Sequence, residues 1–233
     1  MTDDPFLNPV WHALAGPQAE LARRHGMACA YQRDVTRFSA FAQPSPQAYE
    51  DLTRLLGPGE EARLFRPQQD EYRPADWDVA LERPITQMIA DDPALGPPGT
   101  VDAPEGLVAL GPADGAEMLA LAKLTEPGPF EAGTVRIGGF IGVRCAGRLV
   151  AMAGHRIKLP GHVEVSGICT HPDFRGRGLA RTLTRLVMQG IRAAGATPIL
   201  HAFPDNTGAI QLYRTLGFRL NRELMIRWLV TPA

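Results

Sequence analysis

Two hydrophobic periods alternate along the second half of the chain. Apolar residues recur at helical spacing between Arg177 and Ala194, which predicts a helix with one buried face. Shorter runs of the same period predict helices at 114–124 and 206–216. Runs rich in apolar and β-branched residues predict strands at 107–110, 140–145, 149–156, 163–170, 198–203 and 222–230.

The helix expected at 177–194 lies between two predicted strands. A strand, a helix and a second strand in this order predict a right-handed parallel crossover. The elements together predict an α/β fold, in which helices flank a mixed central sheet. We assign this fold to a domain of residues 105–233.

The first hundred residues carry a weaker pattern. Short helices are expected at 18–24, at 85–90 and at 48–56, the last opened by Ser45 or Pro46. The next element, at 61–65, is expected to be a strand.

Residues 91–104 are rich in Pro, Gly, Asp and Ala, and we expect them to form a linker. Residues 1–100 are therefore expected to form a smaller amino-terminal region, either α-rich or α/β.

Composition narrows the classes of partner. The net charge of −1 gives no electrostatic reason to expect nucleic acid or a membrane surface. Three scattered cysteines (Cys29, Cys145 and Cys169) make neither a disulfide framework nor a metal-ligand spacing, so no metal is expected. The start is not signal-like, so a cytoplasmic protein is expected. Arginine greatly outnumbers lysine, which favours a bacterial source with a GC-rich genome.

The strongest motif is the run Arg175-Gly176-Arg177-Gly178-Leu179-Ala180, which follows a predicted strand and opens a helix. Free N–H groups and the helix dipole attract an anion at such a place, and glycine lets the backbone approach it closely. The two arginines add donors for phosphate. The spacing fits neither a P-loop nor a dinucleotide fingerprint. The alternative is a glycine-softened turn with solvent-facing arginines.

With the preceding Thr170-His171-Pro172-Asp173-Phe174, this run resembles the acyl-CoA signature of the GNAT N-acetyltransferase superfamily. Downstream, the segment from Asn206 to Phe218 resembles the second signature of that family, which contains a tyrosine, here Tyr213. The resemblance covers residues 107–229 and is nearest to glycine N-acyltransferase-like domains. In these domains a degenerate half-domain precedes the catalytic one, as residues 1–100 would here.

The resemblance implies acetyl-CoA as co-substrate and assigns residues to it. Backbone groups of Ile168, Cys169 and Thr170 would pair with the pantetheine arm, which Asn206 would also bind. The N–H groups from Gly176 to Ala180 would bind the pyrophosphate. Tyr213 would donate a proton to the departing sulfur.

Glu164 is the candidate general base, because family members with a strand glutamate as base carry it at this spacing. In a partly apolar cleft the pKa of its carboxyl group would be raised, which suits a base acting through water. The alternative is a strand residue that faces solvent or pairs with Arg156. His155 is the reserve candidate.

The loop from Thr125 to Phe130 lies where the family builds its acceptor pocket. Glu126 would hold a cationic acceptor and Phe130 would line the pocket, although the loop is equally explained as a rigid connection. Trp11, Phe65 and Trp77 would wall the same pocket from the amino-terminal region.

The predicted function is transfer of an acetyl or other short acyl group from coenzyme A to an amine, by direct attack in a ternary complex. A small molecule and a peptide amino-terminus are both open as acceptors, and the sequence does not predict the oligomeric state. The alternative function is a non-catalytic acyl-CoA sensor or interaction module. The candidate proton donor Tyr213 and base Glu164 argue against it, because binding alone requires neither.

Overall fold

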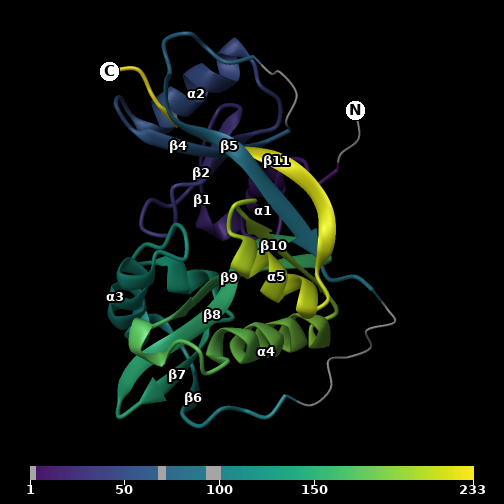
Figure 1. The fold of residues 1–233 in the computed structure, drawn as a ribbon. Coiled ribbons are helices and arrows are strands. Elements are labelled where there is room, and N and C mark those ends of the chain that lie inside the picture. The colour runs from purple at the N-terminus through teal and green to yellow at the C-terminus, as the bar shows by residue number, and fades with distance from the viewer. Residues whose placement is uncertain (1–3, 68–71, 93–100) are drawn as a thin grey trace.

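An eight-stranded mixed sheet forms the centre of the molecule in a computed structural model that describes residues 4–67, 72–92 and 101–233 (Figure 1). Its strand order is β4-β11-β5-β10-β9-β8-β7-β6. Within the described residues, β9 and β10 form the parallel pair and the other neighbours are antiparallel. The predicted α/β class with a mixed central sheet is confirmed.

The elements predicted after residue 105 are present. The strands are β6 (Leu107–Ala109), β7 (Ile141–Cys145), β8 (Arg148–Leu159), β9 (His162–Thr170), β10 (Thr197–Ala202) and β11 (Arg219–Val230). The helices are α3 (Gly115–Thr125), α4 (Leu179–Ala193) and α5 (Thr207–Thr215). Short 3-10 turns occupy Pro112–Asp114, Thr134–Ile137 and Pro172–Phe174.

The amino-terminal region contains both helices and strands. They are α1 (Pro9–Ala15), a 3-10 turn at Ala19–Leu21, β1 (Ala22–His25), β2 (Ala28–Tyr31), β3 (Ser39–Phe41), α2 (Pro46–Leu56), β4 (Glu61–Arg66) and β5 (Asp78–Ile89). The predicted start of α2 is confirmed, because Ser45 Oγ accepts a hydrogen bond from the Ala48 amide.

Two predicted helices are wrong. The segment 18–24 forms the 3-10 turn and the start of β1, which pairs with β2. Residues 85–89 of the other segment belong to β5, where Thr86 to Ile89 pair with β10 on one side and with β11 on the other. Strand pairing outweighs the local helical period in both cases, with the neighbouring β2 in the first and with strands distant in sequence in the second. Residues 93–100 of the predicted linker lie outside the described residues.

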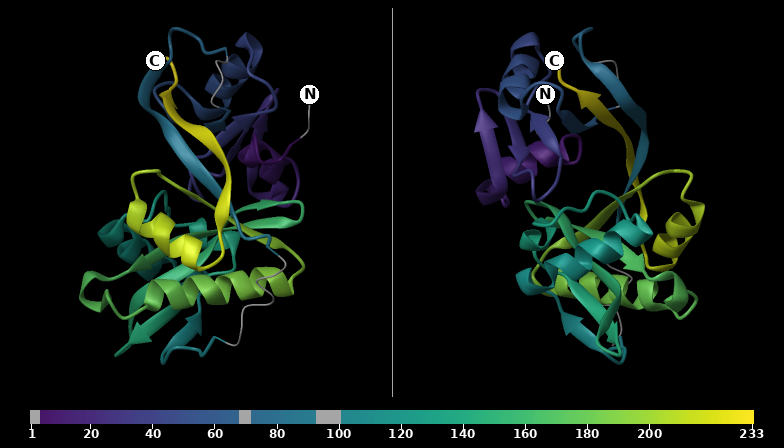
Figure 2. Two further views of the ribbon diagram at one scale, coloured as in Figure 1. Left: turned by 45° about the vertical axis from the view of Figure 1, so that its right-hand side comes forward. Right: turned by 90° about the vertical axis from the view of Figure 1, so that its left-hand side faces the viewer.

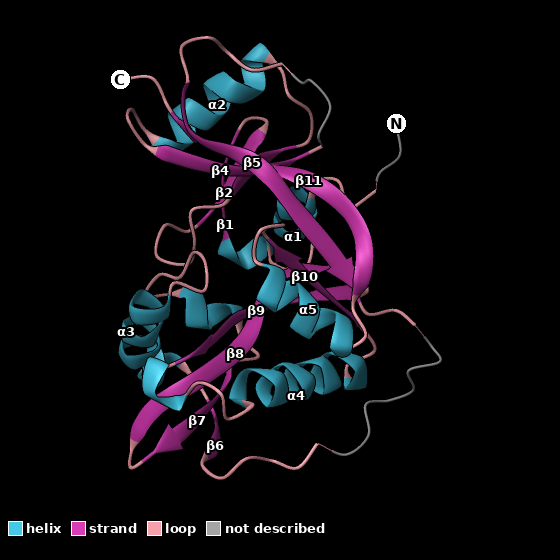
Figure 3. Ribbon diagram, in the orientation of Figure 1, coloured by secondary structure: helices cyan, strands magenta, loops and turns pink. Residues whose placement is uncertain are grey.

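Helices cover both faces of the lower part of the central sheet, around β8 and β9 (Figure 3). On one face, α4 buries Leu183, Val187 and Ile191 against β8 and β9, as its predicted apolar face requires. On the other face, α3 buries Met118 and Leu121. The core therefore has a helix, sheet and helix layering at the end that carries the sequence motifs.

The upper end is built from strands on both sides of the expected boundary at residue 100. β4 and β5 pair with β11 along most of its length. The small sheet β1-β2-β3 stands across from this strand ribbon, and α2 lies at the upper end (Figure 2), where its apolar side chains cluster with residues of β2, β4 and β11. One continuous sheet thus includes residues from before and after 100, and the division into two domains stays a prediction.

The parallel pair of β9 and β10 opens after a short contact. Its paired residues run only from Thr197 with His162 to Ile199 with Glu164. Beyond this point β9 continues to Thr170 on β8 alone. Backbone N–H and C=O groups on one edge of β9 are therefore left for another partner.

Candidate active site

A cavity of about 440 Å³ lies where β9 leads into α4. Its walls come from the end of β9, from the turn that follows and from the first turn of α4. The lining includes Ile168, Cys169, Thr170, Arg175, Gly176, Gly178, Leu179 and Ala180, which the sequence predicted as acyl-CoA contacts. We call it the first cavity.

Two glycines shape the backbone of the first cavity. Gly176 and Gly178 both have φ of 75°, a region that side chains with a Cβ rarely adopt. α4 begins at Leu179 without a side-chain cap, and its first helical hydrogen bond runs from Thr182 to the Gly178 carbonyl. No described residue accepts from the amides of the first turn, so these donors suit a phosphate anion.

The other predicted contacts lie around the first cavity. Arg177 stacks on the Phe174 ring, with 4.7 Å from Cζ to the ring centroid, and donates to the Asp173 carbonyl. Asn206 caps α5, since its Oδ1 accepts from the Ala209 amide at 3.2 Å. It lines a neighbouring cavity instead of the first one.

This second cavity has a volume of about 720 Å³ and adjoins the first. Ile168, Ala180 and Leu212 line both, so the two spaces meet beside the end of β9. The second cavity is closed mainly by aromatic and charged side chains, which are Phe38, Arg63, Phe65, Lys123, Glu126, Phe130, Arg156, His201, Phe203, Tyr213 and Trp228. A thioester in the first cavity would thus face an acceptor in the second.

Tyr213 lines the second cavity from α5. Burial raises the pKa of its hydroxyl, an effect that Arg156 opposes and Glu164 supports. The phenol is therefore protonated at neutral pH and is able to donate. The structure thus places the predicted proton donor beside the junction of the two cavities.

Glu164 is ionised and fully engaged, which contradicts the predicted rise in its pKa. Burial would raise that pKa, but Arg156 and His201 outweigh it and lower the pKa to about 2. Its carboxylate accepts from Arg156 Nε at 2.9 Å and Nη2 at 2.5 Å, and from His201 Nδ1 at 2.7 Å. The side chain has no exposed area and lines neither cavity. The pairing with Arg156, which the sequence left as the alternative, is what the structure contains.

A bulge in β8 turns Arg156 toward Glu164. His155 pairs with Val165 and Lys158 with Val163, so β8 carries one residue more than β9 between these pairs. The Ile157 amide donates to Glu164 Oε2 at 3.2 Å. The side chain of Arg156 is thereby placed between the carboxylate and the second cavity.

The amino-terminal region holds this bulge. Gln18 is 1% exposed, and its Nε2 donates to the Arg156 carbonyl at 2.9 Å. Its Oε1 accepts from the Lys158 amide at 2.9 Å and from the Tyr31 hydroxyl at 2.7 Å. The shape of β8 beside the site therefore depends on a residue about 140 positions earlier in the chain.

His201 continues the network to the other side of the sheet. Asn221 donates to Gln87 Oε1 at 2.7 Å, so the amide nitrogen of Gln87 faces His201 Nε2 at 2.9 Å. In this arrangement His201 carries its proton on Nδ1 and donates it to Glu164. The ring is therefore held between the Gln87 amide and the Glu164 carboxylate.

His155, the reserve base, lines neither of the two large cavities. Burial, with a smaller contribution from Lys158, lowers its pKa to about 4. Its Nδ1 is buried and has no hydrogen-bond partner among the described residues. The ring packs so closely on Gly139 that a Cβ there would lie 2.2 Å from it. This environment does not favour His155 as the base.

Residues 126–130 of the loop that was predicted to build an acceptor pocket line the second cavity, and the role of the loop stays a prediction. Glu126 and Phe130 both line this cavity. Phe130 also packs edge-on against Phe140, with ring centroids 5.7 Å apart. Of the three aromatic residues predicted to wall the pocket from the amino-terminal region, Phe65 does so, whereas Trp11 and Trp77 do not line it.

Sequence reasoning missed several side chains of the second cavity, among them Phe38, Arg63, His201 and Trp228. Arg156 entered only as a partner for Glu164. These residues lie on β4, β10 and β11 and in the segment before β3, and no local motif connects them. Register across the sheet brings them together, as in the pair of Arg63 with Trp228.

The sequence profile of the family described as FR47-like protein matches residues 141–228. A crystal structure of a GNAT-family acetyltransferase from Novosphingobium aromaticivorans is 43% identical, with a TM-score of 0.88. The match covers 99% of this chain and 100% of that one. The chain belongs to the GNAT family of acetyltransferases. A GNAT structure from Kribbella flavida, 19% identical with a TM-score of 0.63, covers 96% of this chain and 95% of its own and shares the fold.

This GNAT chain matches only part of the length of two curated relatives. An uncharacterised protein of Mycobacterium leprae is 31% identical in an alignment of 223 positions that covers 84% of this chain and 60% of that protein. The N-alpha-acetyltransferase RimI of Mycobacterium tuberculosis is 36% identical in an alignment of 83 positions that covers 34% of this chain and 51% of RimI. The chain thus spans little more than half the length of either relative.

Two general features complete the description. None of the helices in the described ranges is long and apolar enough to cross a bilayer. Over the same residues, no three His, Cys, Asp or Glu side chains gather as ligands of a metal ion would. The predicted cytoplasmic location stays a prediction.

Proposed function

We propose that the protein transfers an acetyl group from acetyl-CoA to an amine by direct attack in a ternary complex. The proposal rests on the two adjoining cavities. One ends at the uncapped amino-terminus of α4 and suits a pyrophosphate, and the other holds Tyr213 and suits an acceptor. Their shared wall at Ile168 is where a thioester and an amine would meet.

Binding of acetyl-CoA would use backbone groups for most of its contacts. The amides at the start of α4 would hold the pyrophosphate. The edge of β9 from Ile168 to Thr170, which β10 leaves unpaired, would hydrogen-bond the amide groups of the pantetheine. No described residue accepts from the side-chain amide nitrogen of Asn206, which would add a donor beside this edge.

The transfer itself needs few groups. The amine nitrogen attacks the thioester carbonyl carbon, and the bond from that carbon to sulfur breaks. Tyr213 gives its proton to the leaving sulfur and recovers one, through water, from the newly acylated nitrogen. Positioning of both substrates in adjoining cavities supplies much of the rate.

Glu164 would act as a positioning residue in this reaction. With its pKa lowered to about 2, it would bind a proton only weakly at neutral pH. Its hydrogen bonds instead hold Arg156 and His201 in the wall of the second cavity. Its earlier assignment as general base stays a prediction that this environment does not favour.

Calorimetric titration with acetyl-CoA tests the first cavity. Gly178→Asp adds a carboxylate where the pyrophosphate would bind, and should weaken binding by at least about tenfold. Gly195→Asp is the matched control, because Gly195 has φ of 77° and open space at the other end of α4. Both substitutions introduce similar backbone strain, so the difference between them reports the pyrophosphate site. Equal affinity in the two variants would reject it.

Turnover of acetyl-CoA with a panel of amines decides between an enzyme and an acyl-CoA sensor. Release of free thiol that depends on the amine supports the enzyme. Binding of acetyl-CoA without turnover of any amine would support the sensor. RimI is named as an N-alpha-acetyltransferase. Because this chain is similar to RimI over 83 residues, the panel of amines includes a peptide amine. The resemblance to glycine N-acyltransferase-like domains rests on the two sequence motifs and stays a prediction.

A further inference from the structure

The charged side chains of the second cavity do not fit a cationic acceptor. Its lining contains Arg63, Lys123 and Arg156 but, among the described residues, only one carboxylate, that of Glu126. Glu126 and Lys123 lie on exposed positions, whereas the two arginines are mostly buried. The deeper part of the wall is therefore cationic.

One edge of the Arg156 guanidinium is not used by Glu164 and is available to the cavity. Nε and Nη2 donate to Glu164, and the side chain is 11% exposed. No described residue accepts from Nη1, and a Cβ built on Gly128 would lie 3.7 Å from it. Nη1 is thus directed at the loop that borders the second cavity, while the balancing carboxylate lies behind it.

Arg63 is arranged in the same way. Its Nε donates to Glu61, which does not line the cavity, and its guanidinium lies 4.1 Å from the centre of the Trp228 ring. The side chain is 16% exposed, and neither Nη atom has a partner among the described residues. Two half-buried guanidiniums therefore have unused donors at one cavity, where a ligand or water can accept from them.

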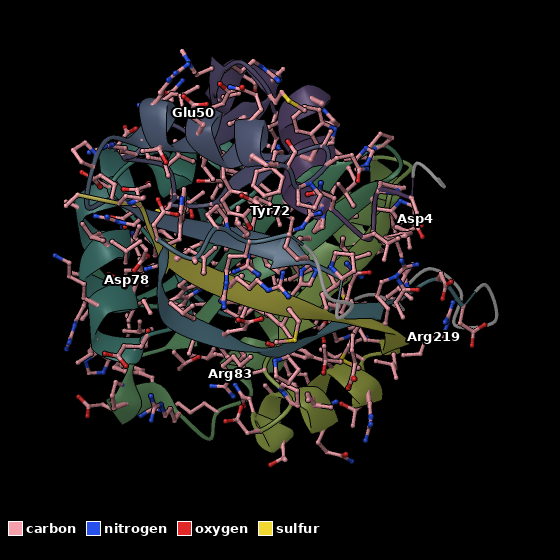
Figure 4. All side chains as sticks on the ribbon, turned by 90° about the horizontal axis from the view of Figure 1, so that it is seen from above. Asp4, Glu50, Tyr72, Asp78, Arg83 and Arg219 are labelled. Atoms are coloured by element: carbon pink, nitrogen blue, oxygen red, sulfur yellow. The ribbon has the colours of Figure 1, made fainter. Side chains whose placement is uncertain are left out.

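The rest of the wall is apolar. Phe38, Phe65, Phe203, Ile85, Ile226 and Trp228 face the same space. Arg83 (labelled in Figure 4) fixes one of them, because its guanidinium stacks on Phe203 at 4.1 Å and pairs with Asp205 at 2.8 Å. A ligand of this cavity would thus bring both a negative group and a large apolar group.

We propose that the second cavity binds an amino acid with a large apolar side chain, whose carboxylate is held by Arg63 and Arg156. This rests on the proposed acetyl transfer and names its acceptor. The Arg156 guanidinium lies within electrostatic reach of the Tyr213 hydroxyl, so a carboxylate on Arg156 places an amine a few bonds away beside the thioester. Planar carboxylates match the fork of a guanidinium, which supports a carboxylate over other small anions.

The same arginines explain how an amine loses its proton without a dedicated base. An ammonium group near guanidiniums in a mostly apolar cavity is disfavoured by like charge and by desolvation. The amino group of the bound acceptor would therefore deprotonate more readily than in water, and its proton would leave to solvent. Glu164 does not have to accept it.

Acceptor pairs that differ only in charge test this inference. The probes are L-phenylalanine and L-leucine, their carboxamides, and phenethylamine, each assayed with acetyl-CoA. We expect kcat/KM for at least one acid to exceed that for its amide by about tenfold or more. Arg63→Gln should remove most of this preference and change kcat/KM for the amides by less than about threefold. Arg156 is not substituted in this test, because its loss would leave the buried Glu164 carboxylate without its guanidinium partner.

Arg54→Gln is the matched control, since Arg54 pairs with Glu50 on the exposed side of α2 and lines neither cavity. It should leave the preference for acids unchanged. Equal turnover of acids and amides would overturn the inference, as would an equal loss for both in Arg63→Gln. Better turnover of an uncharged peptide amine would overturn it too.

The outcomes separate the inference from the proposed function. If acetyl-CoA binds and no acid is acetylated, the choice of acceptor is wrong while the acyl-CoA site stands. If acetyl-CoA does not bind to the unaltered protein, the proposed function fails first.

Discussion

The two cavities share a wall, but they are built in opposite ways. The first is formed largely by consecutive residues at the end of β9 and the start of α4, and its chemistry comes from backbone amides and two glycines. The second is formed by side chains from β4, β8, β10, β11, α5 and the loop after α3.

This difference separates recognition that depends on local backbone shape from recognition that depends on the whole fold. A helix amino-terminus binds a phosphate through groups that every residue has, so a short motif is sufficient. A carboxylate is held by individual side chains, and their positions depend on register and on bulges. Changes in the second network should therefore impair acceptor use and stability while sparing acetyl-CoA affinity.

Glu164→Gln should have the largest effect. It leaves Arg156 and His201 buried without their carboxylate, and we expect the free energy of unfolding to fall by about 3–5 kcal/mol. Chemical denaturation measures the loss, with Glu50→Gln on the surface as control. A change below about 1 kcal/mol would mean that the network does not support the fold.

The same residue predicts a dependence of stability on pH. The pKa of Glu164 in the folded protein is lowered from an ordinary 4.5 to about 2, so the folded state binds this proton less well than the unfolded state does. The stabilisation is therefore present above about pH 4.5 and is lost as the pH falls toward 2. In Glu164→Gln this part of the acid-induced loss should be absent.

Gln18→Leu should have the second-largest effect on stability. It removes the hydrogen bonds to the Arg156 carbonyl, the Lys158 amide and the Tyr31 hydroxyl, and we expect a loss of about 2–4 kcal/mol. KM for the acceptor should rise because the bulge that places Arg156 is released, while the Kd for acetyl-CoA stays within about twofold. Gln43→Leu, at an exposed position just before α2, is the control. An unchanged acceptor KM would disconnect the amino-terminal region from the site.

Tyr213→Phe should reduce kcat by about 10²-fold, which corresponds to about 2.7 kcal/mol in the activation free energy. Acetyl-CoA affinity should change by less than about threefold, since the ring and its packing on Phe218 are kept. Steady-state kinetics and calorimetry give the two numbers. An unaltered kcat would remove Tyr213 as the proton donor.

His155→Gln should have the smallest effect. With a pKa lowered to about 4, His155 is already neutral throughout the pH range of an ordinary assay, and it lines neither large cavity. We expect kcat within about twofold and an unchanged pH profile above pH 6. Loss of the acidic limb of that profile would restore His155 as the base.

The elements after residue 105 were predicted well because each has its own signal. The apolar face of α4 and the runs that form β8 to β10 are readable without knowledge of their partners. The amino-terminal region was predicted less well, because the strands that replace the helices expected at 18–24 and 85–90 are stabilised by pairing with β2, β10 and β11. Local periodicity carries no information about such partners.

The features of the site likewise fall into those that local sequence predicts and those that depend on the tertiary structure. The sequence by itself determined the first cavity and the place of Tyr213 on α5, since glycines with positive φ and a helix start act through nearby backbone. Only the tertiary structure decided what Glu164 does and which groups face the acceptor. Burial and the nearness of Arg156 and His201 set the pKa of that carboxyl group. Those contacts join residues that are 8 and 37 positions apart, across neighbouring strands.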